Sequence, residues 1–344
     1  MAYTTIKKPS DYFNTKLYTG NGTTDTAITG VGFQSDMTWI KSRSSATSHS
    51  LTDAVRGNTK GLYPDLTNAE NSSSNYIKSF DSDGFTLGTD SIINANGATF
   101  VSWNWLANGA GSANTDGTIS STVSANTTSG FSIVSYTGNG SAGATVGHGL
   151  NVAPSMIIFK RRDTTQSWIT YHQSLGTGHY LYLNSSDASS SASGDWCTPN
   201  ASTFQLNQVF TATNTNTATY IAYCFAEKKG FSKFGSYTGN GSADGTFIYT
   251  GFKPAFILIK KNAVASWYIN DNKRSSSGGF NVSDEYLRPN LPNGTGTDQN
   301  GGDFVSNGFK LRNADTDYNA SGATYIYMAF AEEPLVGDNP CTAR

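Results

Sequence analysis

The stretch Tyr18-Thr19-Gly20-Asn21-Gly22 occurs three times in the 344-residue chain. It returns as residues 136–140 and again as residues 237–241. Self-similarity at such intervals indicates that a chain is built from copies of one supersecondary unit. Because glycine and asparagine tolerate positive φ, we expect each copy to form a hairpin turn, the first one joining strands that carry Tyr18 and Ile28.

Three further anchors follow each copy in the same order: an apolar run that ends in lysine, a segment that begins with serine, and a closing strand that begins Ala-Thr. The apolar runs are 37–41, 156–160 and 256–260, the serine segments are 48–57, 167–176 and 266–275, and the closing strands are 98–105, 218–225 and 323–330. From the opening tyrosine to the first residue of the closing strand the intervals are 80, 82 and 86 residues. Four anchors in register predict one unit used three times.

The closing strands predict the core. In period-two register Val101, Trp103 and Trp105 share one face, whereas Ser102 and Asn104 alternate on the other. The matching apolar faces are Ile221, Tyr223, Phe225 and Ile326, Met328, Phe330. We expect these nine residues to be core, and we expect the lysine-terminated runs to be central strands covered on both faces.

Composition agrees with an all-β chain. Glycine contributes 36 residues and aromatic residues 12%, while no stretch of eleven residues holds a helical period. We therefore predict three tandem antiparallel β-sandwiches of lectin-like or jelly-roll type, each of about 100 residues.

The predicted boundaries divide the chain into six parts. They are an N-terminal arm (1–15), unit one (16–106), a Gly/Ser/Thr-rich linker (107–130), unit two (131–227), unit three (228–332) and a polar tail (333–344). The second half of the linker alternates weakly and is compatible with an edge strand. Because the join between units two and three is short, we expect these two to form a rigid pair, with unit one at a different angle.

The net charge of −2, with 14% charged residues, predicts no nucleic-acid partner and no membrane-binding basic face. The chain begins without an apolar signal segment, and no run approaches the roughly 20 residues of a membrane span. We expect synthesis in a cytoplasm with reduced cysteines. Cys197, Cys224 and Cys341 lack metal spacing, and Cys224 is predicted to be a small buried hydrophobe.

No catalytic, cofactor or metal site is predicted. The dinucleotide-type glycine pattern at 138–143 falls in a turn, and its other copies break the pattern. The acidic stretches 81–84 and 315–317 look like fragments of calcium loops but lack enough oxygen ligands, so turn carboxylates are the favoured interpretation. Asp53, His172 and Asp271 align at one polar position without a shared nucleophile beside it.

Two tryptophans are candidates for glycan contact. Trp168 and Trp267 occupy the same position in units two and three. An exposed indole ring stacks well on a sugar, although a half-buried sandwich tryptophan is the favoured interpretation. In the N-terminal arm, Tyr12 and Phe13 are candidates for docking on a neighbouring protein, with a disordered leader as the alternative.

Several of these stretches match a known pattern. They are 251–254 (Gly-Phe-Lys-Pro) with 256–260, 83–87 (Asp-Gly-Phe-Thr-Leu) and 218–222 (Ala-Thr-Tyr-Ile-Ala). The pattern resembles the repeated domain of virion structural proteins in tailed phages of marine bacteria, which are labelled tail, fibre or capsid-associated. The resemblance covers about 16–332, with departures at Ser35 and at 202–204 that look like loop variation.

The resemblance implies a non-enzymatic virion protein, with a tail or fibre component favoured. It implies other virion proteins as partners and a symmetric homo-oligomer, with a trimer favoured, and the distal loops would contact a host surface, which could include a glycan. A capsid decoration or cement protein is the alternative within virions. A free glycan-binding lectin and a glycan depolymerase are alternatives of other classes, and an aromatic cleft or a carboxylate pair would favour them respectively.

Overall fold

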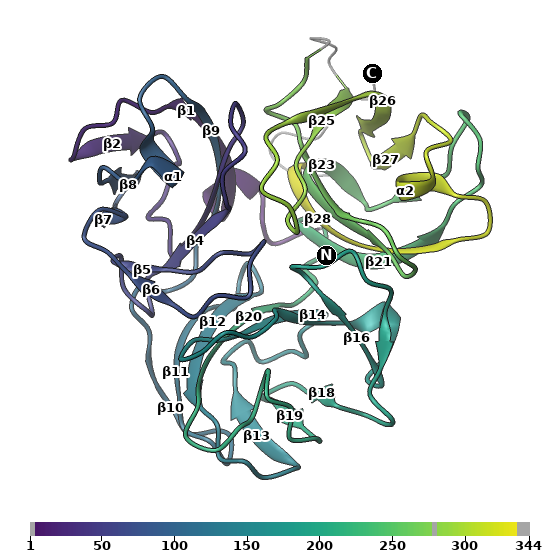
Figure 1. Cartoon of the computed structure of the whole chain (residues 1–344). Helices are drawn as coiled ribbons and strands as arrows, with labels where there is room; N and C mark the ends of the chain where they lie inside the picture. Colours follow the sequence, from purple (N-terminus) through teal and green to yellow (C-terminus); the bar gives the residue numbers. More distant parts are fainter. Residues whose placement is uncertain (1–3, 277–280, 336–344) are drawn as a thin grey trace.

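The computed structural model describes residues 4–276 and 281–335, and this part of the chain is almost entirely β-structure. All of its strand pairs between named strands are antiparallel, as the composition predicted. The helices in it are short: α1 (Ser91–Asn94), α2 (Thr316–Asn319), η1 (Pro9–Asp11) and η2 (Gln173–Leu175). Figure 1 shows three lobes around a common centre, formed by the first, middle and last parts of the chain.

One strand order occurs in all three units. The central strands of each large sheet are the closing strand and the lysine-terminated strand. In order, the strands are β1 (Phe13–Thr19), β9 (Thr99–Trp105), β3 (Met37–Ser42) and β4 (Ser50–Asp53); β12 (Phe131–Thr137), β20 (Thr219–Phe225), β14 (Met156–Arg161) and β15 (Ile169–His172); and β21 (Ser232–Thr238), β28 (Thr324–Pro334), β23 (Phe252–Lys261) and β24 (Trp267–Asp271). In unit two, β10 (Ser112–Asn114) and β11 (Ser121–Asn126) extend one edge, and β16 (His179–Tyr182) and β17 (Ser190–Ser191) extend the other.

A smaller sheet packs on the outer face of each large sheet. The smaller sheets are β2 (Thr26–Thr29), β8 (Gly84–Leu87) and β7 (Ile77–Asp81); β13 (Ala144–Gly147), β19 (Thr203–Leu206) and β18 (Cys197–Pro199); and β22 (Phe247–Tyr249), β27 (Gly308–Leu311), β26 (Gly296–Val305) and β25 (Val282–Tyr286). A two-stranded sheet of β5 (Lys60–Gly61) and β6 (Asn71–Ser72) completes unit one. The space between each large and small sheet holds a separate hydrophobic core.

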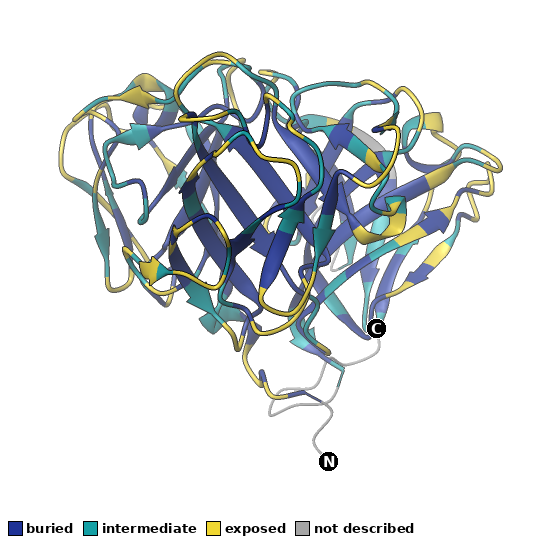
Figure 2. Cartoon of the chain, turned by 90° about the horizontal axis from the view of Figure 1, so that it is seen from below, coloured by how far each residue is buried: buried dark blue, intermediate teal, exposed yellow. Residues whose placement is uncertain are grey.

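The large sheets are apolar on both faces. The nine closing-strand residues that were predicted to be core are all buried, and they meet in one central cluster shared by the three units. The alternate residues, such as Phe100, Tyr220 and Tyr325, point the other way into the core of their own unit. Seen from below, buried strands run through the middle of the molecule (Figure 2). Each large sheet is therefore covered by its own small sheet on one side and by the other two units on the other.

The Tyr-Thr-Gly-Asn-Gly motif is not a hairpin turn, so that prediction is wrong. β1 pairs with β9 whereas β2 pairs with β8, so the motif carries the chain from one sheet to the other. A Cβ on Gly20 would lie 2.4 Å from the Ala95 carbonyl oxygen, and Gly22 has φ of +70°. The repeated glycines are thus required by a close backbone approach and by a left-handed residue.

A buried asparagine holds each copy of the motif. Asn94, Asn214 and Asn319 are fully buried, and each side-chain oxygen accepts the backbone N–H of the motif asparagine, at 3.0, 3.0 and 2.9 Å. Each side-chain nitrogen donates to nearby carbonyl oxygens, for example Asn214 to Ser141 at 2.8 Å. The recurring tyrosine also contributes: Tyr136 donates its hydroxyl to the Thr213 carbonyl at 2.8 Å.

Two boundary expectations need correction. β11 confirms the edge strand in the second half of the 107–130 linker, but β10 also forms in the glycine-rich half. The polar tail was predicted to begin at residue 333, whereas β28 continues to Pro334, which pairs with Phe252. Residues 336–344, which include Cys341, lie outside the described residues.

We predict that Asn214→Ala lowers the free energy of unfolding by about 1–3 kcal/mol, because buried backbone and side-chain groups lose their partners. Urea denaturation followed by tryptophan fluorescence measures the change. Asn216→Ala is the matched control, because Asn216 is exposed on the same turn. Equal stabilities of the two variants would contradict the role given to Asn214.

Candidate functional site

The junctions between the units are the most elaborate polar sites in the described chain. Each lies beside the central apolar cluster, where the fourth strand of one large sheet meets its neighbour. Unit one packs as closely as the other two: Trp103 donates its indole N–H to Asp271 of unit three at 3.0 Å. Units two and three were expected to form a rigid pair with unit one at a different angle, whereas all three units share the central cluster.

A ring of three side-chain donors closes the junctions. Trp168 of unit two donates to the Tyr63 carbonyl of unit one at 2.9 Å, and Trp267 of unit three donates to the Tyr182 carbonyl of unit two at 2.9 Å. In unit one His49 occupies the corresponding position, and its Nε2 lies 3.0 Å from the Arg288 carbonyl oxygen of unit three. The three contacts run in one direction around the centre, so each unit contacts the next.

The structure excludes Trp168 and Trp267 as glycan platforms. Their exposed fractions are 0% and 1%, and their indole N–H groups are satisfied by the carbonyl oxygens of the neighbouring unit. A ligand cannot stack on rings that the neighbouring unit covers. The favoured alternative was a half-buried tryptophan, and both rings are more deeply buried than that.

The aligned polar residues Asp53, His172 and Asp271 form a second ring. Tyr223 of unit two donates to Asp53 at 2.7 Å, as Trp103 donates to Asp271. At the third junction the residue that matches Trp103 and Tyr223 is Met328, which cannot donate. There the acceptor carboxylate is replaced by His172, whose Nε2 lies 3.1 Å from the Tyr327 carbonyl oxygen.

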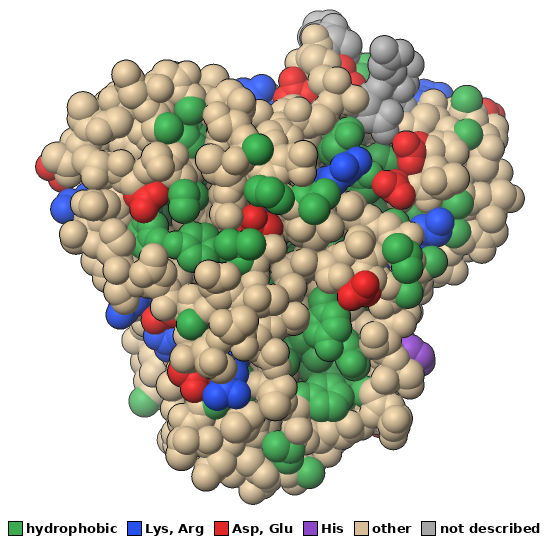
Figure 3. Space-filling model, in the orientation of Figure 1, with side chains coloured by type: hydrophobic (Ala, Val, Ile, Leu, Met, Phe, Trp, Pro, Cys, Tyr) green, Lys and Arg blue, Asp and Glu red, His purple; other side chains and the backbone are tan. Residues whose placement is uncertain are grey.

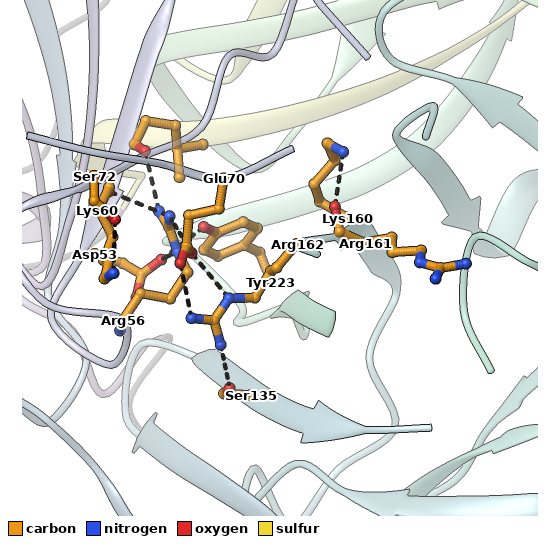
Figure 4. A network of polar contacts seen from close by, with 11 residues as sticks. Asp53, Arg56, Lys60, Glu70, Ser72, Ser135, Lys160, Arg161, Arg162 and Tyr223 are labelled. Atoms are coloured by element: carbon orange, nitrogen blue, oxygen red, sulfur yellow. Dashed lines mark hydrogen bonds and ion pairs between the residues drawn. The ribbon is translucent and has the colours of Figure 1, made fainter. Parts of the chain in front are cut away.

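A chain of ion pairs links units one and two (Figure 4). The buried Arg56 bonds to Asp53 and lies 3.2 Å from Glu70, which also takes two hydrogen bonds from Arg162 of unit two at 2.9 and 3.0 Å. Burial raises the pKa of Glu70, but the two guanidinium groups outweigh burial and hold this pKa below its usual value. Because each buried charge has partners of opposite sign, this arrangement is a structural clamp.

A fully buried lysine lies one residue before the end of each of β3, β14 and β23. The Nζ atoms of Lys41, Lys160 and Lys260 donate to the carbonyl oxygen of the next residue, at 2.9, 2.7 and 2.6 Å. Burial lowers the pKa of each amine to about 8. Lys160 also donates to the Thr67 carbonyl of unit one at 3.2 Å, so its ammonium group lies at the junction between units one and two.

The docking prediction is wrong for Phe13. This residue begins β1, is 2% exposed, and packs against Trp105, Phe256 and Phe330 with ring centroids 4.9 to 5.4 Å apart. Tyr12 is partly buried and meets Phe231 edge to face. Phe13 looked available to a partner because a short terminal segment shows no periodicity. Its partner surface is the centre of its own chain.

The other motifs have structural roles as well. Asp83 accepts backbone N–H groups of Gly30 and Gly32, and Asp315 accepts the N–H of Asp317 at the start of α2, which confirms the turn-carboxylate interpretation. Within residues 4–276 and 281–335 no group of three His, Cys, Asp or Glu residues is placed to hold a metal ion. Cys197 and Cys224 are buried, and burial raises the pKa of both thiols, which disfavours the reactive thiolate.

Unit two carries a surface hollow that its sequence did not predict. Its volume is about 300 Å³, and it is lined by Tyr180, Tyr182, Phe210 and Val209, with Gln166 and Thr211 at its polar side. Val209 is 47% exposed, and the rings of Tyr180, Tyr182 and Phe210 are partly exposed. Figure 3 shows a hydrophobic patch in a hollow over β16 on an otherwise mostly uncharged face. Tyr180 and Tyr182 alternate with buried residues on β16, and that alternation alone did not distinguish a hollow from a core.

The fold and the junctions define an all-β protein in which several antiparallel sheets meet around a shared apolar centre. Residues 8–334 match a family described as a domain of unknown function, DUF7483, and the chain belongs to this family. No curated protein and no solved structure matches the chain. Among the residues that the structure describes, the helices are too short to cross a membrane.

We predict that Phe13→Ala lowers the free energy of unfolding by about 3–5 kcal/mol, because it leaves a cavity where the ring packs against three other aromatic rings. Urea denaturation of the purified chain measures the loss. Tyr18→Phe is a milder comparison that removes only a hydroxyl contact to the Ile93 carbonyl. If Phe13→Ala left the free energy of unfolding unchanged, the placement of Phe13 in the core would be contradicted.

Acid should destabilise the protein through the buried histidines. Burial lowers the pKa of His172 to about 4 and that of His49 to about 3. Below the ordinary value of about 6.5 the unfolded chain therefore takes up protons that the folded chain does not. As the pH falls from 6.5 toward 4, each histidine should remove up to about 1.4 kcal/mol of stability per pH unit.

The test is the pH dependence of urea denaturation between pH 7 and 5. His172→Asn should make this dependence shallower, whereas His179→Asn, at an exposed residue of β16, should leave it unchanged. The same slope in both variants would show that His172 is not buried as a neutral ring.

Proposed function

We propose that the chain is a non-enzymatic structural protein of a tailed-phage particle, built of three copies of one lectin-like or jelly-roll-type β-sandwich. The observation that carries the proposal is the cyclic set of junction contacts around one core, because it makes three similar units into a single rigid body. Such a body presents three similar sets of loops at fixed angles, and an attachment component requires this kind of rigid display. The resemblance of the unit pattern to phage tail, fibre and capsid-associated proteins points in the same direction.

A tail or fibre position is favoured within this proposal, and a capsid decoration protein is the alternative. In either case the partners are other virion proteins, and synthesis occurs in the host cytoplasm before assembly. Phe13 is not available to anchor the chain, so the contact with the particle falls to other surfaces. The expected homotrimer stays a prediction. The internal three-fold arrangement offers a second possibility, in which one chain meets a symmetric neighbour at three similar edges.

Glycan binding is the second candidate function, because the hollow at Tyr180, Tyr182 and Phe210 offers partly exposed aromatic rings with polar groups beside them. Sugars present apolar C–H faces that pack on aromatic rings and hydroxyl groups that need polar partners. A lectin-like role at this hollow is compatible with host attachment by a virion protein.

We predict that cryo-electron microscopy of the intact particle places this chain in symmetric copies on the tail or the capsid. Light scattering of the purified chain provides the oligomeric state, with a mass near 36.6 kDa for a monomer and three times that mass for the favoured trimer. Particles that lack the chain, together with a free monomer that binds neutral oligosaccharides, would replace the virion proposal with the lectin.

A further inference from the structure

The junction between units one and three contains a second hollow, of about 320 Å³. Unit one contributes 43–46 and unit three contributes Tyr286, Arg288 and 293–296. Its volume falls at the lower end of the roughly 300–1,000 Å³ typical of small-molecule sites. Two arginines, two serines, an asparagine and glycine-rich backbone give this hollow a polar lining.

Arg288 is a cation held in place without a carboxylate. Its guanidinium carbon lies 5.1 Å from the ring centroids of both Tyr268 and Tyr286, and one Nη donates to the Tyr268 hydroxyl at 2.9 Å. Within the described residues no carboxylate lies within ion-pair distance of it, and its buried Nε has no partner. The corresponding residues of units one and two are Tyr63 and Tyr182, which carry no charge. The cation is thus specific to this junction.

Arg43 makes fewer side-chain hydrogen bonds than the equivalent arginine of unit two. Arg162, at the same position in unit two, makes three hydrogen bonds of 2.9 to 3.0 Å, two to Glu70 and one to Ser135. Arg43 makes one side-chain contact, to Glu285 at 3.2 Å, and its Nε is buried without a partner. The Thr295 hydroxyl in the same wall is also buried and unpartnered.

From these contacts we infer that the hollow at Arg43 and Arg288 binds a sugar-sized organic anion, with its carboxylate or phosphate group on Arg288. Arg43 and Arg288 are the charged residues that line the hollow. The Glu285 charge is paired with Arg43, and Asp317 meets Arg288 only through the Tyr268 hydroxyl, so the hollow keeps a positive charge. Planar guanidinium groups recognise both oxyanions through paired hydrogen bonds. Ser44, Ser45 and Asn293 provide hydrogen-bonding groups for sugar hydroxyls, and Tyr286 provides an aromatic surface. The inference does not depend on the protein being part of a virion.

Ligand-observed NMR on the full chain tests this inference with glucuronate, glucose 6-phosphate, glucose and inorganic phosphate. We expect one or both sugar anions to bind, more weakly as salt is added, and glucose not to bind. The preferred anion identifies the carboxylate or the phosphate as the natural group. Binding of glucose as tight as that of the sugar anions would overturn the role of charge. Binding of inorganic phosphate as tight as that of the sugar anions would show that the sugar part does not contribute, and would overturn the assignment of a sugar-sized ligand.

Variants locate the binding. Arg288→Gln should weaken the binding of the sugar anion at least about tenfold, whereas Arg161→Gln, which removes an arginine paired with Asp163 elsewhere on unit two, should leave it unchanged. Ala46→Trp adds bulk at the exposed wall and keeps both arginines, so it decides the question if Arg288→Gln does not fold. Undiminished binding by folded Arg288→Gln, or by Ala46→Trp, would overturn the assignment.

Discussion

The structure depends on the burial of a second apolar face on each large sheet. A sheet with one apolar face is complete once a second layer covers that face. Here the small sheets cover only the outer faces, and the inner faces carry rings such as Trp105, Phe225 and Phe330. At about 25 cal/mol for each Å² of apolar surface, exposure of such a face to water would cost many kcal/mol per unit. The three inner faces therefore cover one another, and the units form one body.

Polar contacts at the junctions then fix how the units are arranged. An apolar centre alone tolerates sliding, whereas the carbonyl oxygens that accept from His49, Trp168 and Trp267 are satisfied in only one register. The second ring also keeps its buried polar groups partnered where equivalent residues differ between the units. Where Met328 replaces a donor, His172 replaces the carboxylate that would have been left buried without that partner, and Leu175 stands where Arg56 and Arg274 pair with their aspartates.

Much of this was accessible from the sequence, for identifiable physical reasons. Period-two alternation in the closing strands predicted which residues are core, because burial on one face of a strand leaves that pattern. The same pattern does not reveal what covers the face, so the shared centre was missed and Trp168 was considered as a surface ring. The hairpin at Gly20 was predicted because Gly and Asn tolerate positive φ. A connection between two sheets requires the same backbone conformation, so the residue types do not distinguish the two. The two hollows were not predicted, because each depends on segments far apart in the chain, such as 43–46 and 293–296.

The proposed role in a phage particle and the proposed anion site both require that the three units behave as one rigid body. The most direct test is hydrogen exchange measured by mass spectrometry over a series of urea concentrations, which reports the opening free energy of each closing strand. The account predicts that β9, β20 and β28 lose protection together, with the same opening free energy and the same dependence on urea. Loss of protection in one of these strands at a urea concentration where the other two remain protected would contradict the shared centre.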